Sequence, residues 1–426
     1  MPEIVLPYGR GSISTVLPEK NLLGIYHAAL PPAAADAVQE VESALDAPID
    51  SATLEELAAG KRNAVIIASD HTRPVPSKVL MPALLRRLRK SNPSIDITIL
   101  IATGCHRRTT RDELIGKFGS TIVANEKIVI HDSADENMLV SLGKLPSGGE
   151  LKLNKLAVET DLLLAEGFIE PHFFAGFSGG RKSVLPGIAA RETVMANHCA
   201  EFINSEFART GNLENNPIHQ DMLYAAKKAN LAFILNVVID GSKSIVRAFA
   251  GNPESAHLCG CNYLAGQCRV KVPQADIVIT SNGGYPLDQN IYQSVKSMAA
   301  GEAVCRPGGV LIIAASCSDG HGGEAFYQTL SNMHSPAELL ENISKVPRNQ
   351  TEPDQWQYQI FARILQKHRV IIVSRDCSSD LIRAMHLDAA DSLEKALEKA
   401  YAITGRDAGI AVIPDGVSVI VEKTDS

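Results

Sequence analysis

The chain has 426 residues, a length at which one hydrophobic core rarely suffices, so we expect two domains. Its hydrophobic fraction of 45% and charged fraction of 21% are those of an ordinary globular protein, but aromatic residues make up only 5%. This scarcity of aromatic residues and the formal net charge of −7 argue against a nucleic-acid partner, which favours basic and aromatic surfaces.

The sequence predicts neither a signal peptide nor a membrane span. The first twenty residues lack a basic stretch followed by an apolar core, and no apolar run reaches the roughly 20 residues that cross a bilayer. The C-x-C-x6-C spacing of Cys259, Cys261 and Cys268 lacks the second pair of a zinc site. We therefore expect reduced thiols, no membrane partner and a cytoplasmic location.

Short β-branched runs alternate with helical segments, a pattern typical of parallel α/β sheets. In the first half we expect strands at residues 64–69, 95–102, 127–131 and 161–165, and a helix over 77–90 capped by Ser77. Ligands of such sheets bind outside the carboxyl ends of the strands. The polar segments 103–110 and 167–182 each follow a strand closely, so they lie where a site is expected.

A second set of strands is expected at residues 276–281, 309–314, 369–374 and 410–414, with a helix over 392–402. The predicted fold class is α/β, with two domains that each contain a mainly parallel sheet flanked by helices. We expect the first domain at 1–270, the second at 271–409, and the active site in the cleft between them. The final strand, about 410–426, is a candidate for return to the first domain.

Two polar turns follow the first two strands. Asp70 and Thr72 can hydrogen-bond a sugar or a phosphate, and the planar guanidinium of Arg73 suits a carboxylate or a phosphate. The alternative is an Asx-type turn with a surface arginine. His106 follows the second strand, and an imidazole that titrates near pH 6.5 suits proton transfer in either direction, although an ordinary surface histidine is the alternative.

The most informative segment is EPHFFAGFSGGRKSVLPG at residues 170–187. Gly176, Gly179 and Gly180 would let backbone N–H groups approach an anion closely. Arg181 stands where a Walker A loop needs glycine, so this is not that motif. Lys182 can contact phosphate or, with a lowered pKa, act as a nucleophile. The alternative is a flexible loop with a solvated Arg-Lys pair.

A fourth segment, SNGGYPLDQNIYQSVKS at residues 281–297, ends a strand and starts a helix that we expect near Asp288. On that helix Gln289, Gln293 and Lys296 would lie at i, i+4 and i+7 and share one face. A face of amides and a cation suits a ligand across a cleft, whereas the alternative is a solvated helix face.

Taken together, these segments resemble the nickel-dependent lactate racemase family over nearly the whole chain. The resemblance is carried by SDHTRP at 69–74, ATGCHR at 102–107, the glycine-rich segment at 170–187, Asn197-His198, and YPLDQNIYQSVKS at 285–297. These motifs occur in order and with plausible spacing. The implied activity is that of an isomerase, a racemase or epimerase of a small 2-hydroxy acid.

The resemblance implies a nickel-pincer nucleotide, pyridinium-3-thioamide-5-thiocarboxylic acid mononucleotide, which holds nickel between two sulfur-bearing arms. Lys182 matches the residue that tethers this cofactor as a thioamide, and His198 matches the nickel ligand. A site with sulfur, carbon and imidazole donors suits Ni(II). Asp70 matches a cofactor-contacting position, and the expected cofactor contacts are completed by Thr72, Gly179 and Gly180. The enzymes that build the cofactor are expected as transient partners.

The resemblance also assigns an acid/base pair, His106 and His172, and substrate contacts, Arg73, Gln293 and Lys296. One histidine would take the hydroxyl proton while the hydrogen at C2 leaves as hydride to the cofactor. The planar 2-keto acid would then take the hydride back on its other face and a proton from the second histidine. Direct removal of the C2 proton is disfavoured, because no electron sink lies beside it.

Two other functions remain as alternatives. A nicotinamide-dependent 2-hydroxy acid dehydrogenase would show G-x-G-x-x-G after an early strand, but Gly283-Gly284 and Gly308-Gly309 are isolated pairs. A non-catalytic family member that only binds the cofactor or an acid is disfavoured, because the tether, the metal ligand and both histidines are present. Lactate, malate, 2-hydroxyglutarate, an aryl lactate and a sugar acid share the carboxylate and hydroxyl that such a site would hold.

Overall fold

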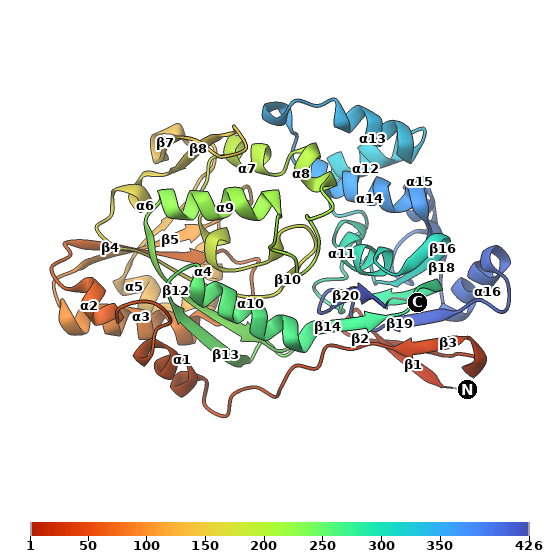
Figure 1. Cartoon of the computed structure of the whole chain (residues 1–426), viewed down its shortest axis with the longest axis horizontal. Coiled ribbons are helices and arrows are strands. Elements are labelled where there is room, and N and C mark those ends of the chain that lie inside the picture. The colour runs from red at the N-terminus through yellow and green to blue at the C-terminus, as the bar shows by residue number, and fades with distance from the viewer. Residues whose placement is uncertain (1, 425–426) are drawn as a thin grey trace.

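The computed structural model describes residues 2–424, which form two lobes side by side (Figure 1). A six-stranded sheet in the order β13-β12-β9-β4-β5-β6 forms the first lobe, and only the β12–β13 pair is antiparallel. Its strands are β4 (Asn63–Ser69), β5 (Asp96–Ala102), β6 (Lys127–Ile130), β9 (Leu163–Phe168), β12 (Leu231–Ile239) and β13 (Ile245–Gly251).

The second lobe contains a six-stranded, fully parallel sheet in the order β18-β17-β16-β15-β19-β3. Its strands are β3 (Leu22–Ile25), β15 (Ala275–Ser281), β16 (Cys305–Ala314), β17 (Arg369–Val373), β18 (Asp388–Ala390) and β19 (Ile410–Ile413). The predicted fold class, two α/β units with mainly parallel sheets, is confirmed.

Helices flank both sheets (Figure 1). Those of the first lobe are α1 (Ala37–Asp46), α2 (Leu54–Ala58), α3 (Ser77–Ser91), α4 (Arg111–Phe118), α5 (Ser120–Asn125), α6 (Lys155–Glu159), α7 (Arg191–Asn197), α8 (Ala200–Asn204), α9 (Pro217–Lys228) and α10 (Ser255–Cys268). Those of the second are α11 (Ile291–Glu302), α12 (Glu324–Ser331), α13 (Pro336–Ser344), α14 (Gln355–Lys367), α15 (Ser379–Ala384) and α16 (Leu393–Thr404). Short 3-10 helices are η1 (Glu19–Asn21), η2 (Glu136–Met138), η3 (Gly180–Ser183) and η4 (Arg348–Gln350).

Four two-stranded sheets accompany the two large ones. Three are antiparallel and one, β14–β20, is parallel. Their strands are β1 (Glu3–Tyr8) with β2 (Gly11–Val16), β7 (Leu139–Lys144) with β8 (Glu150–Asn154), β10 (Pro171–His172) with β11 (Gly176–Phe177), and β14 (Arg269–Val272) with β20 (Ile420–Lys423).

Strand β4 shows how the apolar runs of the sequence form the core. Val65 and Ile67 belong to one hydrophobic cluster, and Ile66 and Ala68 to another. Because successive side chains of a strand point to opposite faces, both faces of β4 are buried. An uninterrupted apolar run is therefore the expected signature of a parallel strand covered by helices on both sides.

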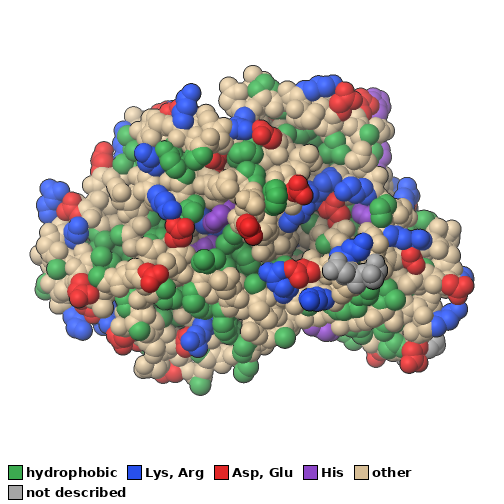
Figure 2. Space-filling view, in the orientation of Figure 1, with side chains coloured by type: hydrophobic (Ala, Val, Ile, Leu, Met, Phe, Trp, Pro, Cys, Tyr) green, Lys and Arg blue, Asp and Glu red, His purple; other side chains and the backbone are tan. Residues whose placement is uncertain are grey.

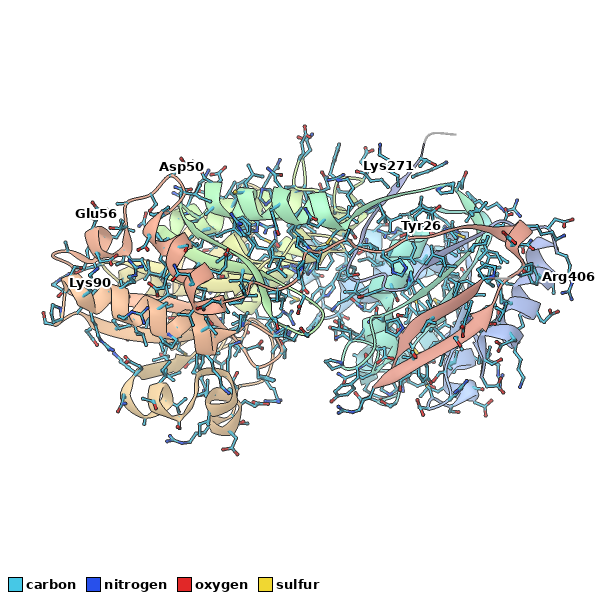
Figure 3. The ribbon with its side chains drawn as sticks, turned by 90° about the horizontal axis from the view of Figure 1, so that it is seen from below. Tyr26, Asp50, Glu56, Lys90, Lys271 and Arg406 are labelled. Atoms are coloured by element: carbon cyan, nitrogen blue, oxygen red, sulfur yellow. The ribbon has the colours of Figure 1, made fainter. Side chains whose placement is uncertain are left out.

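The two ends of the chain depart from the expected domain division. Strand β19 does not return to the first lobe, because it lies between β15 and β3 in the second sheet, and β20 pairs with β14. Strand β3 forms the edge of that same sheet, with Leu22 opposite Ile410. The chain then runs back past Tyr26 to the first lobe near Asp50 (Figure 3). Pairing between residues so far apart in the chain is not encoded in a local pattern.

The expected cap of α3 is wrong. Ser77 is the first residue of that helix and caps nothing, because its hydroxyl donates to the buried carboxylate of Glu166 instead. The sequence showed a serine before a helical pattern but gave no sign of the acid on β9 that competes for its hydroxyl.

Helix α11 begins three residues later than expected. The side chain of Asn290 caps it by accepting a hydrogen bond from the N–H of Gln293 at 3.0 Å. Gln289 therefore lies in the preceding loop and not on the helix face shared by Gln293 and Lys296.

The surface carries charges of both signs, and no disulfide forms among the described residues. Lys and Arg side chains are interspersed with Asp and Glu over the face shown in Figure 2. All eight cysteines are free thiols. Within residues 2–424, no helix combines the length and the apolar character that crossing a membrane requires.

Candidate active site

Two neighbouring parallel strands of the first sheet place an aspartate beside a histidine. Ser69 of β4 is paired with Ala102 of β5, so the turns after these strands meet at one edge of the sheet. There Nδ1 of His106 lies 2.8 Å from Oδ2 of Asp70. A carboxylate can only accept, so Nδ1 carries the proton and Nε2 of His106 keeps a free lone pair.

Asp70 is only 2% exposed, and Thr72 completes its environment. The backbone N–H and the hydroxyl of Thr72 donate to Oδ1 of Asp70 at 3.1 and 2.6 Å. Burial raises the pKa of Asp70, but the hydrogen bonds from His106 and Thr72 outweigh it and leave the pKa below its ordinary value. The carboxylate therefore stays ionised and fixes the orientation of the imidazole.

His172 lies on the short strand β10 at the start of the glycine-rich loop. Its Nδ1 accepts a hydrogen bond from the N–H of Ala175 at 3.3 Å, so the neutral ring carries its proton on Nε2. The ring packs against Phe173 and Phe174. Burial and the positive charge of Lys182 lower the pKa of His172 well below its ordinary value.

Lys182 lies in the 3-10 helix η3 at the end of the loop, and its Nζ is 5.6 Å from the centre of the Phe174 ring. Burial is the main cause that lowers the pKa of Lys182 well below its ordinary value, and the charges of Arg181 and Arg73 add to it. The negative charge of Glu170 acts in the opposite direction. A neutral amine is the form that acts as a nucleophile.

His198 follows α7 directly and is 5% exposed. Its Nδ1 lies 3.1 Å from the carbonyl oxygen of Val194 and must donate to it, which leaves Nε2 without a proton. The ring is held between Phe174 and Trp356, with ring centres 5.1 and 5.0 Å away. Burial and the charge of Lys182 lower the pKa of His198 to about 3, so the imidazole is neutral and suited to bind a metal.

The second lobe contributes Gln293 and Lys296 from α11. Burial, followed by the charge of Arg73, lowers the pKa of Lys296 to about 8. The Oε1 atom of Gln293 is buried and has no hydrogen-bond partner. Leaving such an acceptor unpaired is unfavourable, so the amide is poised for a polar ligand.

Asp288 and the turn of the N-terminal hairpin hold the loop that leads to α11. Oδ2 of Asp288 accepts hydrogen bonds from the N–H groups of Gly9 at 2.6 Å and Ser316 at 3.1 Å. The guanidinium of Arg10 lies 4.1 Å above the ring of Tyr285. The hairpin therefore braces the loop that precedes the helix carrying Lys296.

Arg73, Lys182 and Lys296 bring three basic side chains to one place, where the positive charge of each would lower the pKa of His172. Within residues 2–424, none of the three forms an ion pair, and Glu170 is the acid whose charge acts on both lysines. A cavity of about 300 Å³ on the first lobe also borders Arg73, but Glu113 and Lys117 line it with Arg73, and neither Lys182 nor Lys296 does. Such an excess of positive charge favours an anionic ligand.

The chain matches the model of the lactate racemase N-terminal domain over residues 8–211 and that of the lactate racemase C-terminal domain over residues 270–421. The chain belongs to the lactate racemase family. Membership makes it an isomerase of the racemase type.

Two curated relatives and one solved structure extend this match along the whole chain. A lactate racemase from Thermoanaerobacterium thermosaccharolyticum is 55% identical, and one from Lactiplantibacillus plantarum is 54% identical. Each comparison covers 99% of this chain and all of the relative. The lactate racemase apoprotein structure from the former organism has a TM-score of 0.96 at 55% identity and covers 99% of this chain and all of that one. A Thermotoga maritima protein, 19% identical with a TM-score of 0.61 over 88% of this chain and all of that one, shares the fold alone.

The structure of this lactate racemase family member places most of the sequence-predicted site residues near one another. They form two groups, each connected by electrostatic interactions, ring contacts or hydrogen bonds. Arg73 links the groups, because its charge lowers the pKa of Asp70 and its guanidinium donates a hydrogen bond to Thr72. The first group is Asp70, Thr72 and His106, and the second is Arg73, His172, Lys182, His198 and Lys296.

Packing within the protein explains why residues 179 and 180 are glycines, so no bound cofactor is needed to explain them. The N–H of Gly180 donates to Oδ1 of Asn236 at 2.7 Å and is not free for an anion. A Cβ atom on Gly179 would lie 2.7 Å from the same Oδ1, and one on Gly180 would lie 2.6 Å from the ring of His257. Close packing at positive φ angles therefore explains why glycine occupies both positions.

Sequence reasoning missed Trp356 and Asp354. Trp356, the single tryptophan, reaches His198 from the second lobe. Oδ1 of Asp354 accepts a hydrogen bond from the hydroxyl of Tyr292 at 2.7 Å, and burial and the Asp354 charge raise the pKa of Tyr292. Neither residue belongs to one of the sequence motifs, and the one available signal was that the chain contains a single tryptophan.

Proposed function

We propose that this chain interconverts the enantiomers of lactate, a small 2-hydroxy acid. The observation that carries the proposal is the whole-length similarity to two lactate racemases at 54–55% identity. The unpaired cations Arg73 and Lys296 support it, because both suit the carboxylate of such an acid. Two histidines with their protons on different ring nitrogens further support a reaction that runs in both directions.

We also propose that a nickel-pincer nucleotide is bound here, and the residues present fit it. His198 offers one unprotonated nitrogen, Nε2. Within residues 2–424, no group of three His, Cys, Asp or Glu side chains could hold a metal, so a metal at His198 needs its other ligands from a bound group. A pincer supplies them. The lowered pKa of Lys182, which favours the neutral amine, supports covalent attachment there.

Lys182 and His198 would hold the cofactor, which when bound would supply reversible hydride transfer at C2 of the substrate. Arg73 and Lys296 hold the substrate carboxylate, one from each lobe. Nε2 of His106, oriented by Asp70, takes the hydroxyl proton. His172 can give a proton to the oxygen of the planar keto acid only as the imidazolium, a form that the carboxylate of a bound substrate favours, and it becomes neutral when the other enantiomer forms. In the reverse direction the two histidines exchange these roles.

The tether is tested by intact mass. When the chain is made together with the cofactor-building enzymes, its mass should exceed the sequence mass by one cofactor. Lys182→Ala should abolish this increment, whereas the exposed Lys345→Ala, as matched control, should keep it. An increment that survives in Lys182→Ala would rule out this attachment.

The substrate is tested with the loaded enzyme and a panel of 2-hydroxy acids resolved by chiral chromatography. Either pure lactate enantiomer should approach an equal mixture of both, and faster than malate or 2-hydroxyglutarate. Inversion of another acid with lactate left unchanged would contradict the proposal for lactate while keeping the racemase class.

A further inference from the structure

Arg181 is a fully buried cation without an acidic partner. It is 2% exposed and the largest of the most deeply buried side chains. Within the described residues 2–424, no carboxylate forms an ion pair with it. Burial lowers the pKa of Arg181 to about 10, so it remains charged at neutral pH. Because an uncompensated buried charge is strongly unfavourable, the surrounding dipoles must compensate for it.

Backbone carbonyl groups of the glycine-rich loop supply much of this compensation. Nη2 of Arg181 donates to the carbonyl oxygen of Ala175 at 2.8 Å, and Nη1 donates to those of Phe177 at 2.9 Å and Gly179 at 3.3 Å. Three carbonyl groups of one short loop thus converge on one guanidinium. The planar, fixed geometry of this group sets their relative directions.

Two histidines complete the contacts from separate helices. Nε of Arg181 donates to Nδ1 of His219 on α9 at 2.9 Å. Nε2 of His257 on α10 lies 3.0 Å from Nη1 of Arg181 and 2.8 Å from the carbonyl oxygen of Ser178. Burial, then the charge of Arg181, lowers the pKa of His219 to about 3 and that of His257 well below its ordinary value. Both rings are therefore neutral; His219 accepts a hydrogen bond from the guanidinium, whereas Nε2 of His257 donates to Ser178 and only packs beside it.

The loop that Arg181 contacts in this way carries two residues of the candidate active site. It runs from His172, on β10, to Lys182, whose N–H donates to the carbonyl oxygen of Gly179 at 3.1 Å. The carbonyl oxygen of Gly179 accepts from both Lys182 and Arg181, so the guanidinium holds the carbonyl group to which the backbone N–H of Lys182 is bonded. The positive charge of Arg181 also lowers the pKa of Lys182, because a cation at Arg181 disfavours a second cation beside it.

We infer that Arg181 is a positioning residue, which gathers the carbonyl groups of loop 175–179 and so fixes the direction and the reactivity of the Lys182 amine. The inference rests on the proposed function only for the use of that amine as a tether. It adds a residue that touches neither substrate nor cofactor in the proposed reaction. The groups whose charges face Lys182 are Arg181 on its own segment and Arg73, Glu170 and Lys296 on the others.

The test measures the amine in the chain without cofactor. The chain is treated with a trace of acetic anhydride at pH 7.5, and mass spectrometry gives the acetylation rate of Lys182 relative to exposed Lys345 in the same sample. Arg181→Met should lower this ratio, because loss of the neighbouring cation raises the pKa of Lys182, and each unit of that rise lowers the neutral fraction of an amine by up to about tenfold. Arg181→Lys keeps a cation but loses the fork, so its ratio should lie between those of Arg181→Met and the unchanged chain.

Arg209 offers a matched control, because it also donates to backbone carbonyl groups, those of Ser205 and Ala208. Arg209→Met should lower Tm without changing the Lys182 ratio. A ratio that stays constant or rises in folded Arg181→Lys or Arg181→Met, or that falls equally in Arg209→Met, would overturn the inference. Failure of the tether itself is distinguishable, because the intact-mass increment would then survive in Lys182→Ala whatever the acetylation ratio.

Discussion

Nδ1 of His106 donates to Oδ2 of Asp70 across 2.8 Å, and this one contact fixes which ring nitrogen faces away with a free lone pair. The two residues follow adjacent parallel strands, so the sheet itself sets their separation. Asp70 had been expected at the cofactor, whereas in this structure both of its oxygens are bonded to the protein. We therefore propose that it orients the histidine.

Replacement of this aspartate should impair turnover more than cofactor loading. In Asp70→Asn the amide can donate to Nδ1 of His106 and thereby favour the wrong tautomer. We expect kcat to fall about 10- to 150-fold, which corresponds to about 1.5–3 kcal/mol for a hydrogen bond to a charged group. Steady-state kinetics and intact mass measure both quantities. An Asp70→Asn enzyme with unchanged kcat would refute the orienting role.

Alanine variants of the three histidines of the site should differ in their nickel content. His198→Ala should lose most of the nickel of the loaded protein, because its Nε2 is the free donor. His106→Ala and His172→Ala should keep the metal but lose turnover, since they handle protons. Elemental analysis of the three purified variants checks this division. Equal metal loss in all three would show that the roles are assigned wrongly.

Arg73 and Lys296 should act together on the substrate carboxylate. Arg73→Lys keeps the charge but loses the planar fork, so kcat/KM should fall by a factor equivalent to about 1–3 kcal/mol. Lys296→Ala should have an effect of similar size. Arg107→Lys is a nearby control, because that arginine is paired with Glu113. Unchanged kinetics in both test variants would exclude a carboxylate clamp between the lobes without affecting the cofactor assignment.

Acid should destabilise the fold through its buried neutral histidines. The folded-state pKa of His219 is about 3, whereas an unfolded histidine titrates near 6.5. Between these values the unfolded chain binds a proton that the folded chain does not, so stability is full above pH 6.5 and is lost as the pH falls. Each such histidine should lower the free energy of unfolding by about 1 kcal/mol between pH 6.5 and 5.5.

Urea unfolding of the cofactor-free chain at these two pH values measures the loss. His219→Gln still offers an acceptor to Arg181 and should reduce the pH-dependent loss by about 1 kcal/mol. Measurement at pH 8, where histidines are neutral in both states, gives the packing contribution of the same variant. An identical pH dependence with and without His219 would contradict this account.

Local pattern specified the strands well, because burial on both faces leaves an apolar run such as residues 64–69, which became β4. It specified helix starts less well. Ser77 looks like a cap in sequence, yet Glu166, on another strand, takes its hydroxyl. The loop before α11 is shaped by Gly9, which lies 279 residues away in the chain from Asp288. Long-range contacts decide such details, and no local pattern contains them.

The same distinction applies to the site. His106, His172 and Lys182 belong to motifs and could be predicted from the sequence, whereas the buried residues that contact their loops could not. His219 and His257 contact Arg181 from helices 38 and 76 residues away in the chain. A buried arginine and a solvated one look alike in sequence, so a solvated Arg181 could not be excluded from the motif alone.

The central claim, that the hydrogen at C2 travels as a hydride and never as a free proton, is tested most directly by isotope tracing. Lactate deuterated at C2 is racemised by the loaded enzyme in ordinary water, and the inverted enantiomer is isolated and its mass measured. Retention of deuterium in that product is the predicted result, because the histidines exchange only the hydroxyl proton with solvent. Replacement of the deuterium by protium from water would contradict the account and indicate direct removal of the C2 proton.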